Sequence, residues 1–342
     1  MVPSAPRRPV RFAHVTSTSA TPDSRPRLAD ARISLVDRIG EPAFRVLCGL
    51  AALLTLVLLI WIAETVFDKA SPAISQFGLG FLGRTTWNPV TNNFGAAAFI
   101  YGTFVSSLLA LIIATPTAIF IAIYLTELAP QVIRRPVAIL VELLAAIPSV
   151  ILGLWGIIVL GPFLQHHLEP FLRSFLSWIP LFAGASTTGY SMLNAALILT
   201  IMALPIVTAI TREVFDATPG ELKEGAYALG STRWEMIRMT VLPIARPGLV
   251  GAVILGLGRA LGEAIAVTQV IGNATQISAS LFAPGGSLAS QVASEYQSAN
   301  PGLAQSSLIY LAAILLVISL IVNIVARLIS RRFSVVWAGG GR

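Results

Sequence analysis

The stretch VILGLGRALGEAIAVTQVIG (residues 253–272) carries the features that decide the fold. Most of it is apolar, and about 20 such residues suffice to cross a bilayer as a helix. Yet Arg259 and Glu263 lie inside it, and they are the only charged residues between Arg246 and Glu295. The stretch therefore predicts a membrane-spanning helix that carries two functional charges.

The composition of the whole chain supports this interpretation. Of its 342 residues, 55% are hydrophobic and 11% are charged, whereas soluble domains carry about 25% charged residues. The apolar runs are long rather than short and alternating, which favours helices over a β-barrel. The predicted fold class is an all-α integral membrane protein. One cysteine and three histidines without metal-ligand spacing predict neither a disulfide framework nor a metal site, and no catalytic residue is expected.

Six segments are long and apolar enough to span a membrane: residues 45–66, 97–126, 137–160, 192–211, 248–272 and 305–327. Six spans place both termini on one side. With this arrangement, nineteen of the 23 Lys and Arg residues lie on the side of the termini and three lie on the other. Basic residues concentrate on the cytoplasmic side of membrane proteins, so both termini are predicted to be cytoplasmic. The net charge of +7 then reflects orientation, and no nucleic-acid partner is expected.

These spans divide the chain into three parts. Residues 1–44 form a basic cytoplasmic tail with a short pre-membrane segment, and the composition of residues 1–32 predicts disorder. Residues 45–330 form the six-helix membrane domain, whose core is 97–330. Residues 331–342 form a short cytoplasmic tail.

The cytoplasmic loop 212–247, REVFDATPGELKEGAYALGSTRWEMIRMTVLPIARP, predicts two short helices joined at its LGS triplet. The first begins at Pro219, and Gly230 suits the left-handed residue that follows a helix. Ser231 is predicted to cap the second helix, which is expected to stop before Pro243. A charged helix pair of this kind is either an ordinary solvated loop or a docking element for a cytoplasmic partner.

The spacing in this loop resembles the EAA loop of ABC-importer permeases, which reads E-A-A, three residues, G, nine residues, I-x-L-P. Gly225 replaces an alanine and Thr240 an isoleucine, and Gly225 leaves the helicity of the first segment open. The resemblance implies a coupling helix that sits in a cleft of an ATP-hydrolysing subunit. The residues that it implies for this contact are Glu224, Gly225, Ala226, Gly230, Ser231, Trp234, Leu242 and Pro243.

The chain contains no G-x-x-x-x-G-K-[ST] loop, and its only lysines are Lys69 and Lys223. It is therefore not expected to cradle nucleotide phosphates in that way. If ATP drives its activity, ATP and Mg²⁺ are expected on a separate subunit, and this chain is expected to bind no cofactor.

Three further stretches resemble the phosphate-specific transport permeases of the PstC type: YGTFVSSLLALIIATPTAIFIAIYLTE (101–127), AAIPSVILG (145–153) and RALGE (259–263). The resemblance covers about residues 97–330. It implies a type I ABC-importer permease of the bacterial cytoplasmic (inner) membrane that passes inorganic phosphate by alternating access. Implied partners are a second, homologous permease (PstA-type), an ATPase dimer (PstB-type) and an external phosphate-binding protein (PstS-type).

The resemblance also implies that Arg259 and Glu263 serve phosphate passage. A spacing of four places both side chains on one helix face, about 6 Å apart along the axis, where they can neutralise each other. The planar guanidinium of Arg259 stays charged and suits an oxyanion, while the carboxylate of Glu263 can accept a hydrogen bond from protonated phosphate but not from sulfate. Alternatives stay open: a structural ion pair, a permease for another oxyanion such as sulfate or molybdate, or a secondary transporter driven by an ion gradient.

Small residues surround this pair. Gly258 and Gly262 form a G-x-x-x-G pattern, and Ala252, Gly256 and Ala260 form a second stripe. Small residues let helices approach closely. The sequence leaves open whether these stripes pack within the chain or against a second permease subunit.

Overall fold

The computed structural model describes residues 35–184 and 188–338, so the segment 1–32, for which disorder is predicted, lies outside the described residues. A boundary between two compact units falls inside helix α1 (Leu35–Phe77), between Leu59 and Ile60. The unit that starts at Ile60, termed the membrane unit, contains α2 to α14. The described residues form helices and no strand, which confirms the all-α class.

The longer helices follow one another as α3 (Ala97–Ile123), α4 (Gln131–Ala146), α7 (Glu169–Leu176), α8 (Met192–Asp216), α9 (Gly220–Ala228), α11 (Leu242–Gly262), α13 (Leu288–Glu295) and α14 (Leu303–Ala338). The shorter helices are α2 (Gly80–Gly83), α5 (Ser149–Trp155), α6 (Gly161–Phe163), α10 (Arg233–Met236), α12 (Ile265–Val270) and the 3₁₀ turn η5 (Pro180–Phe182). Four π-helical turns complete them: η2 (Tyr124–Leu128), η3 (Gly156–Leu160), η4 (Leu164–Leu168) and η6 (Ile237–Val241).

Six helical segments of the described chain are long and apolar enough to cross a membrane: Ala43–Phe77, Ala97–Leu128, Ser149–Leu176, Met192–Asp216, Arg233–Gly262 and Leu303–Ile329. The number of spans agrees with the sequence analysis, and four of the six overlap their predicted ranges closely. Two predicted ranges are wrong. The third, 137–160, crosses a break at Pro148, and the fifth, 248–272, crosses a break at Glu263.

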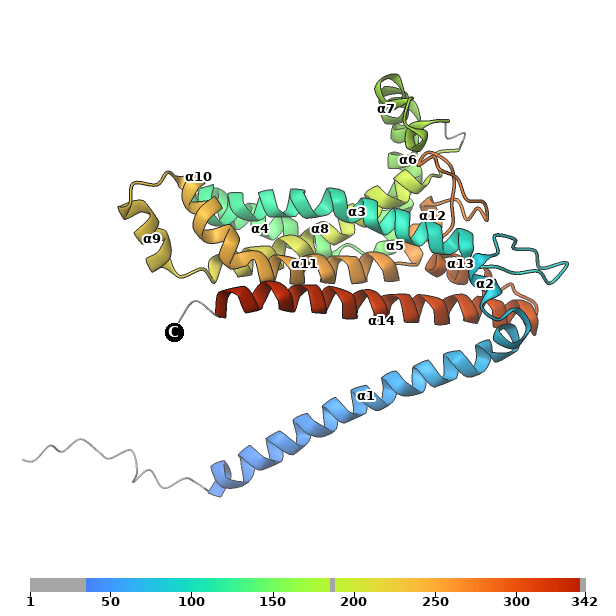
Figure 1. Cartoon of the computed structure of the whole chain (residues 1–342), viewed down its shortest axis with the longest axis horizontal. Helices are drawn as coiled ribbons and strands as arrows, with labels where there is room; N and C mark the ends of the chain where they lie inside the picture. Colours follow the sequence, from blue (N-terminus) through green and yellow to red (C-terminus); the bar gives the residue numbers. More distant parts are fainter. Residues whose placement is uncertain (1–34, 185–187, 339–342) are drawn as a thin grey trace, which may run out of the picture. The chain divides into compact units, whose positions relative to one another are not determined.

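The centre of the membrane unit is built from α3, α8, α11 and α14. These helices lie side by side along the long axis of Figure 1, with α3 packed along α8, and α11 packed against α8 and α14. The hydroxyl of Thr200 on α8 donates to the carbonyls of Ala196, within its own helix, and Ala110 on α3, at 2.8 and 3.3 Å. Alanines such as Ala110, Ala114 and Ala203 are buried where α3 and α8 meet, so small side chains allow the close packing.

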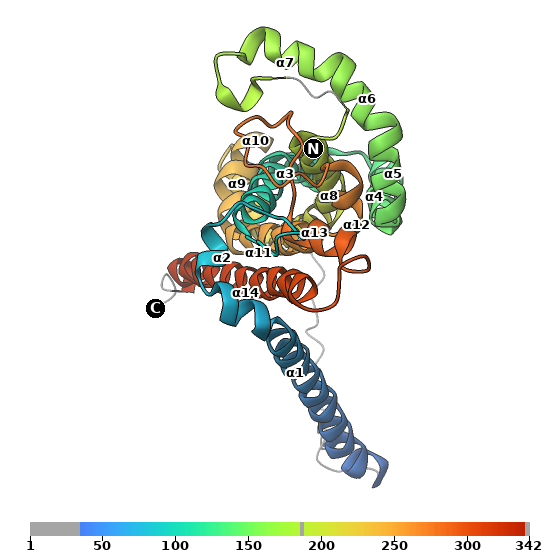
Figure 2. The same cartoon turned by 90° about the vertical axis from the view of Figure 1, so that its right-hand side faces the viewer.

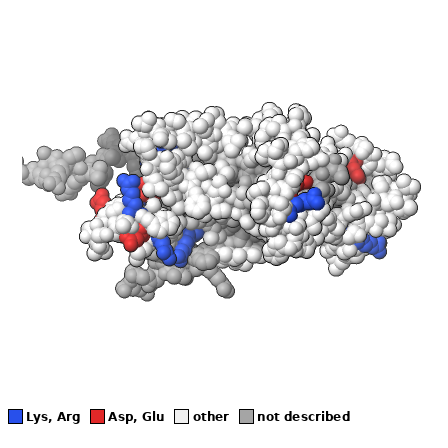
Figure 3. All heavy atoms as spheres, turned by 90° about the horizontal axis from the view of Figure 1, so that it is seen from above, with Lys and Arg blue, Asp and Glu red and all other residues white. Residues whose placement is uncertain are grey.

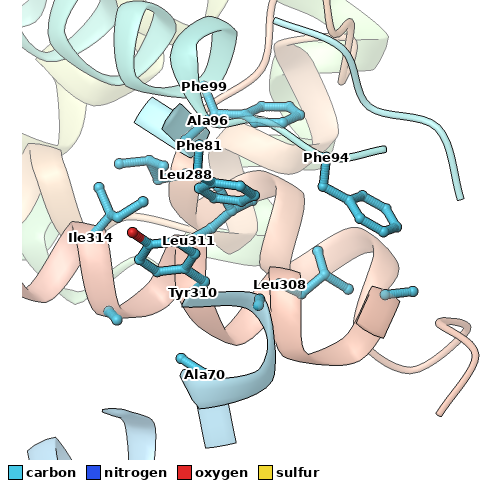
Figure 4. Close-up of a cluster of buried hydrophobic side chains, with 13 residues drawn as sticks. Ala70, Phe81, Phe94, Ala96, Phe99, Leu288, Leu308, Tyr310, Leu311 and Ile314 are labelled. Carbon is cyan, nitrogen blue, oxygen red and sulfur yellow. The ribbon is translucent and has the colours of Figure 1, made fainter. Parts of the chain in front are cut away.

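The two ends of the membrane unit differ in character. α9 and α10 lie at one end of Figure 1, and α2, α12 and α13 lie toward the other. At the latter end an aromatic cluster joins α2, α3 and α14, and Figure 4 shows Phe81 over Tyr310 and Phe99 above them. The rings of Phe81 and Tyr310 stack with centroids 4.5 Å apart. Figure 3 shows charged side chains gathered at the α9–α10 end, with most of the middle of the visible face uncharged.

The segment after α5 leaves the direction of the bundle. α6 and α7 turn away from the long axis in Figure 1, and Figure 2 shows α7 at the top of the view, above the bundle. The π-helical turns η3 and η4 interrupt this segment, and such turns are a common cause of bends.

Candidate transport site

Two interrupted helices meet beside Arg259. α4 gives way to α5 at Ile147, which is extended (φ −68°, ψ 124°) ahead of Pro148, and a residue before proline disfavours the helical conformation. α11 ends at Gly262, and Glu263 is extended (φ −73°, ψ 118°) ahead of α12. Irregular backbone at membrane depth is tolerated where it is buried in protein or lines a cavity, and broken helices of this kind form substrate sites in transporters.

α12 lies against α5 because glycines leave room for it. A Cβ added at Gly153 would stand 2.9 Å from Ala266 Cα, and one added at Gly156 would stand 2.6 Å from a methyl carbon of Val270. Ala266 and Val270 are fully buried. This docking takes α12 off the axis of α11 and explains a break at Glu263 that no proline marks. It also brings the stretch AAIPSVILG close to the residues that follow RALGE.

Arg259 borders a cavity of about 50 Å³ between the two breaks. The other lining residues are apolar and come from α4, the Ile147 turn, α5 and α8: Leu144, Ala145, Ile147, Leu152, Met202 and Ile206. Among the residues that the structure describes, Arg259 is the only charged side chain of this lining, and a cation in such surroundings favours an anion nearby. Sequence reasoning named Arg259 but missed its apolar neighbours, although the AAIPSVILG stretch holds three of them.

The predicted pairing of Arg259 with Glu263 on one helix face is wrong. Glu263 lies beyond the end of α11, and its carboxylate accepts the N–H of Ala266 at 3.3 Å, in the first turn of α12. Within the part of the chain that the structure describes, no ion pair joins the two side chains. Arg259 is exposed and Glu263 is half-buried. The service of these two residues in substrate passage stays a prediction.

The two small-residue stripes of α11 have different surroundings. Ala252 and Ala260 are buried, and a Cβ added at Gly256 would stand 2.7 Å from a methyl carbon of Val207 on α8. That stripe therefore packs within the chain. A Cβ added at Gly258 or Gly262 would meet none of the described residues beyond its own stretch of helix within 4 Å. The G-x-x-x-G face is therefore open in the single chain.

In the loop 212–247, α9 ends as predicted at a left-handed glycine. Gly230 has φ +85°, a conformation that residues with a side chain adopt only with strain. The N–H of Gly230 donates to Tyr227 O at 2.9 Å and that of Ser231 donates to Ala226 O at 3.2 Å, which satisfies carbonyls at the helix end. Gly225 lies inside α9, so the question that it left open is answered: the first segment is helical.

The N-cap of the second helix is Thr232, so the prediction of Ser231 is wrong by one position. The Glu235 N–H donates to Thr232 Oγ1 at 3.4 Å, and the Thr232 N–H donates to Glu235 Oε2 at 2.8 Å. This reciprocal pair is a capping box. The Ser231 hydroxyl instead donates to Ala226 O at 2.7 Å, because Ser231 belongs to the end of α9.

The sequence predicted that the second helix stops before Pro243, and this prediction is wrong. α10, η6 and α11 follow without a gap, and the N–H of Leu242 donates to Ile237 O across the wider π turn. Pro243 lies in the first turn of α11, directly after the π turn η6. A proline has no N–H to donate, and the widened turn before it accommodates this loss. The second part of the loop, from Arg233, and the fifth span therefore form one continuous helical segment, Arg233–Gly262.

A groove of about 770 Å³ lies between α9 and the start of the second helix. It is lined by Glu221, Leu222, Gly225, Ala226, Leu229, Gly230, Ser231, Glu235, Met236, Met239, Thr240 and Ile244. Leu229 is 91% exposed and Met239 is 73% exposed, and Trp234 in α10 is 58% exposed. Exposed apolar side chains on a charged element mark a contact surface. Four residues of the EAA-like motif, Gly225, Ala226, Gly230 and Ser231, line the groove, whereas Glu224 is exposed outside it.

Comparisons with known proteins identify the family. Residues 114–335 match the family described as the binding-protein-dependent transport system inner membrane component. The phosphate transport system permease protein PstC of Mesorhizobium japonicum is 47% identical over 315 residues, which cover 90% of this chain and 96% of the relative. The chain belongs to the PstC family of importer permeases. The PstC of Haemophilus influenzae is 44% identical over 291 residues, which cover 84% and 92% of the two chains.

The fold agrees with membership of the PstC family. A crystal structure of a bacterial alginate ABC transporter with an alginate-bound periplasmic protein superimposes with a TM-score of 0.57, covering 87% of this chain and 97% of the other. At 18% identity this likeness shows the fold alone. As a PstC-family permease the chain is a multi-pass, non-catalytic component of the inner membrane. Among its described residues, no group of three His, Cys, Asp or Glu could hold a metal ion.

Proposed function

We propose that this chain is one of two permease subunits of an ATP-driven importer of inorganic phosphate and that both of its termini are cytoplasmic. The observation that carries the proposal is the position of Arg259, which borders an apolar cavity where two broken helices meet. The names of the relatives supply the substrate, since those proteins are phosphate transport permeases.

The chemistry of Arg259 suits phosphate. A guanidinium stays charged when desolvated and offers two parallel donors to an oxyanion. Glu263 follows four residues later, at the break. Its carboxylate repels an anion without a proton, such as sulfate, but accepts a hydrogen bond from a phosphate that carries a proton. We infer that Glu263 favours phosphate over sulfate and speeds its release from Arg259.

The partners follow from two open surfaces. The G-x-x-x-G face of α11, with Gly258 and Gly262, fits a homologous permease helix, because small residues let helix backbones approach. The groove at α9 fits an element of an ATPase dimer, which would hold ATP and Mg²⁺. A phosphate-binding protein would deliver the substrate from the external side. ATP binding would close the ATPase dimer, and the α9–α10 pair would carry that motion into α11.

The test is phosphate uptake by the complex reconstituted in proteoliposomes with the ATPase, the second permease and the binding protein. Arg259→Ala is expected to lower ATP-dependent uptake about 10- to 100-fold, as expected for loss of charge-assisted hydrogen bonds worth roughly 1.5–3 kcal/mol. Full uptake by this variant would remove the role of Arg259. A chain that lacks residues 221–235 is expected to lose both ATPase association and uptake, and uptake that persists without an ATPase would refute the ATP-driven mechanism.

The substrate is tested in the same vesicles. Uptake of phosphate is compared with that of sulfate and molybdate in the parent complex and with Glu263→Gln. The parent is expected to prefer phosphate, and Glu263→Gln is expected to reduce that preference several-fold. An unchanged preference would refute the role of Glu263, and a parent complex that prefers sulfate or molybdate would refute the assignment of phosphate.

A further inference from the structure

The end of α3 holds a largely buried ion pair with the cytoplasmic loop. Glu127 lies in η2, and its side chain is 8% exposed. Lys223, from α9, places Nζ 2.5 Å from Glu127 Oε1, and its side chain is 21% exposed. A charge pair so far removed from water is maintained only where geometry holds both partners, because desolvation opposes it.

α9 has few other attachments to the membrane helices. None of its residues is buried, and Ala226 packs at the edge of an apolar cluster that includes Phe215 and Ile237. Lys223 precedes Ala226 by three residues, so both lie on one face of α9. Lys223 does not line the groove. The ion pair therefore leaves the groove free for a partner while it ties α9 to the turn that follows α3.

The same turn is also tied to α4. The guanidinium of Arg134 donates from Nε to Leu125 O and from a terminal nitrogen to Thr126 O. Carbonyls at a helix end lack helical partners, and an arginine can satisfy them. Residues 125–127 thus join three elements: α3 itself, α4 through Arg134 and α9 through Lys223.

Two of these elements lead to the cavity beside Arg259. α4 supplies Leu144 and Ala145 to its lining. α3 packs along α8, which supplies Met202, and also contacts α11, which carries Arg259. A displacement of α9 can therefore reach the cavity through α3 and α4, without passing along α10 and η6.

We propose that the Lys223–Glu127 pair is a positioning pair that transmits the movement of α9 to α3 and α4 during transport. This inference rests on the proposed coupling to an ATPase. Lys223 and Glu127 are not expected to touch substrate or nucleotide. Their task is to make the end of α3 follow α9, so that ATP hydrolysis produces passage of the substrate.

The test measures ATP hydrolysed per phosphate imported by the complete complex in proteoliposomes. Glu127→Gln and Lys223→Met are each expected to raise this ratio about threefold or more, within the range that coupling residues show. Lys223→Met is expected to have the larger effect, because it leaves the less exposed partner, Glu127, without its cation, whereas the long stem of Lys223 lets its ammonium reach water. The exchanged variant, Glu127→Lys with Lys223→Glu, is expected to bring the ratio back toward that of the parent.

The control is Glu142→Gln, which removes another interhelical pair, Glu142 with Arg212 at 3.6 Å, whose carboxylate side chain is 64% exposed. It is expected to leave the ratio unchanged. The inference is wrong if both single variants keep the parent ratio, or if the exchange is no better than the singles. Should Lys223→Met fail to assemble, Glu127→Gln and the exchange decide alone. A parent complex without phosphate-dependent ATP hydrolysis would instead refute the proposed function.

Discussion

The α9–α10 pair and the α11–α12 junction are both interruptions of helical structure, but they arise in different ways. At the first, Gly230 adopts a left-handed conformation and Thr232 caps the next helix, so the turn is determined by residues next to one another in the sequence. At the second, Glu263 leaves the helix without a proline, and α12 departs because Ala266 docks on Gly153, more than a hundred residues earlier. The comparison shows that local chemistry ends a helix in one place and tertiary packing ends it in the other.

The two interruptions are also expected to respond differently when helices move. The turn between α9 and α10 is held by hydrogen bonds among its own residues, so it can keep its shape when a partner moves the loop. The α11–α12 junction depends on contacts with α5, so a change in helix packing can alter the surroundings of Arg259. Substitutions at each interruption should show whether local chemistry or tertiary packing produces it.

Gly153→Val should have the largest effect, because it targets the packing that produces the α11–α12 junction. The added Cβ would stand 2.9 Å from backbone carbon Cα of Ala266, which cannot swing aside. We expect a loss of about 3 kcal/mol in the stability of the chain, as for severe overpacking. Thermal unfolding in nanodiscs measures it. Gly251→Val, on α11 where no atom lies within 4 Å of the added carbon, is the control, and equal stability of the two variants would contradict this origin of the break.

Gly230→Val tests the interruption that is local. A β-branched residue at φ +85° is strained by about 2 kcal/mol. Because the strain falls on the end of α9, we expect ATPase co-purification to drop while the thermal unfolding of the membrane helices stays near that of the parent. Gly230→Asn, which tolerates this conformation better, should retain more association. A variant with valine that binds the ATPase as well as the parent would show that the glycine turn is dispensable.

Much of the fold could be predicted from sequence because membrane spans are long and apolar. The six spans, the all-α class and the turn at Gly230 rest on such local signals. The breaks could not be predicted in the same way. Pro148 offered a signal within a predicted span, but the break at Glu263 depends on the contact of Ala266 with Gly153, which no local pattern reveals.

The residues of the candidate site also fall into two groups: some are revealed by local sequence, and others are brought together only by folding. Arg259 stood out because a charge in an apolar run is rare, and the EAA-like spacing located the docking loop. The groove between α9 and the second helix, and the pair of Lys223 with Glu127, depend on residues brought together by folding. Residue spacing also gave a wrong result where it assumed a continuous helix, as for Arg259 and Glu263.

Gly258→Leu tests the open face of α11 against its packed stripe. In the described part of the chain, a Cβ added at Gly258 would have no neighbour within 4 Å, whereas one added at Gly256 would meet Val207 at 2.7 Å. We expect Gly258→Leu to leave the unfolding temperature of the chain unchanged and to weaken association with the second permease about tenfold, or roughly 1.4 kcal/mol. Gly256→Leu should instead destabilise the chain itself. Association measured by co-purification that is unaffected by Gly258→Leu would show that this face meets lipid.

Thr232→Ala and Ser231→Ala should have the smallest effects, and they distinguish two neighbouring hydroxyls in the local interruption. Thr232 accepts the Glu235 N–H, so its loss should weaken α10 by about 1 kcal/mol, the usual value of an N-cap. Ser231 donates to Ala226 O at the end of α9, so its loss should act there instead. Amide hydrogen exchange measures both: the Glu235 amide should exchange about fivefold faster in Thr232→Ala and at the parent rate in Ser231→Ala. The reverse result would restore Ser231 as the cap and would mean that the α9 turn extends no further than Gly230.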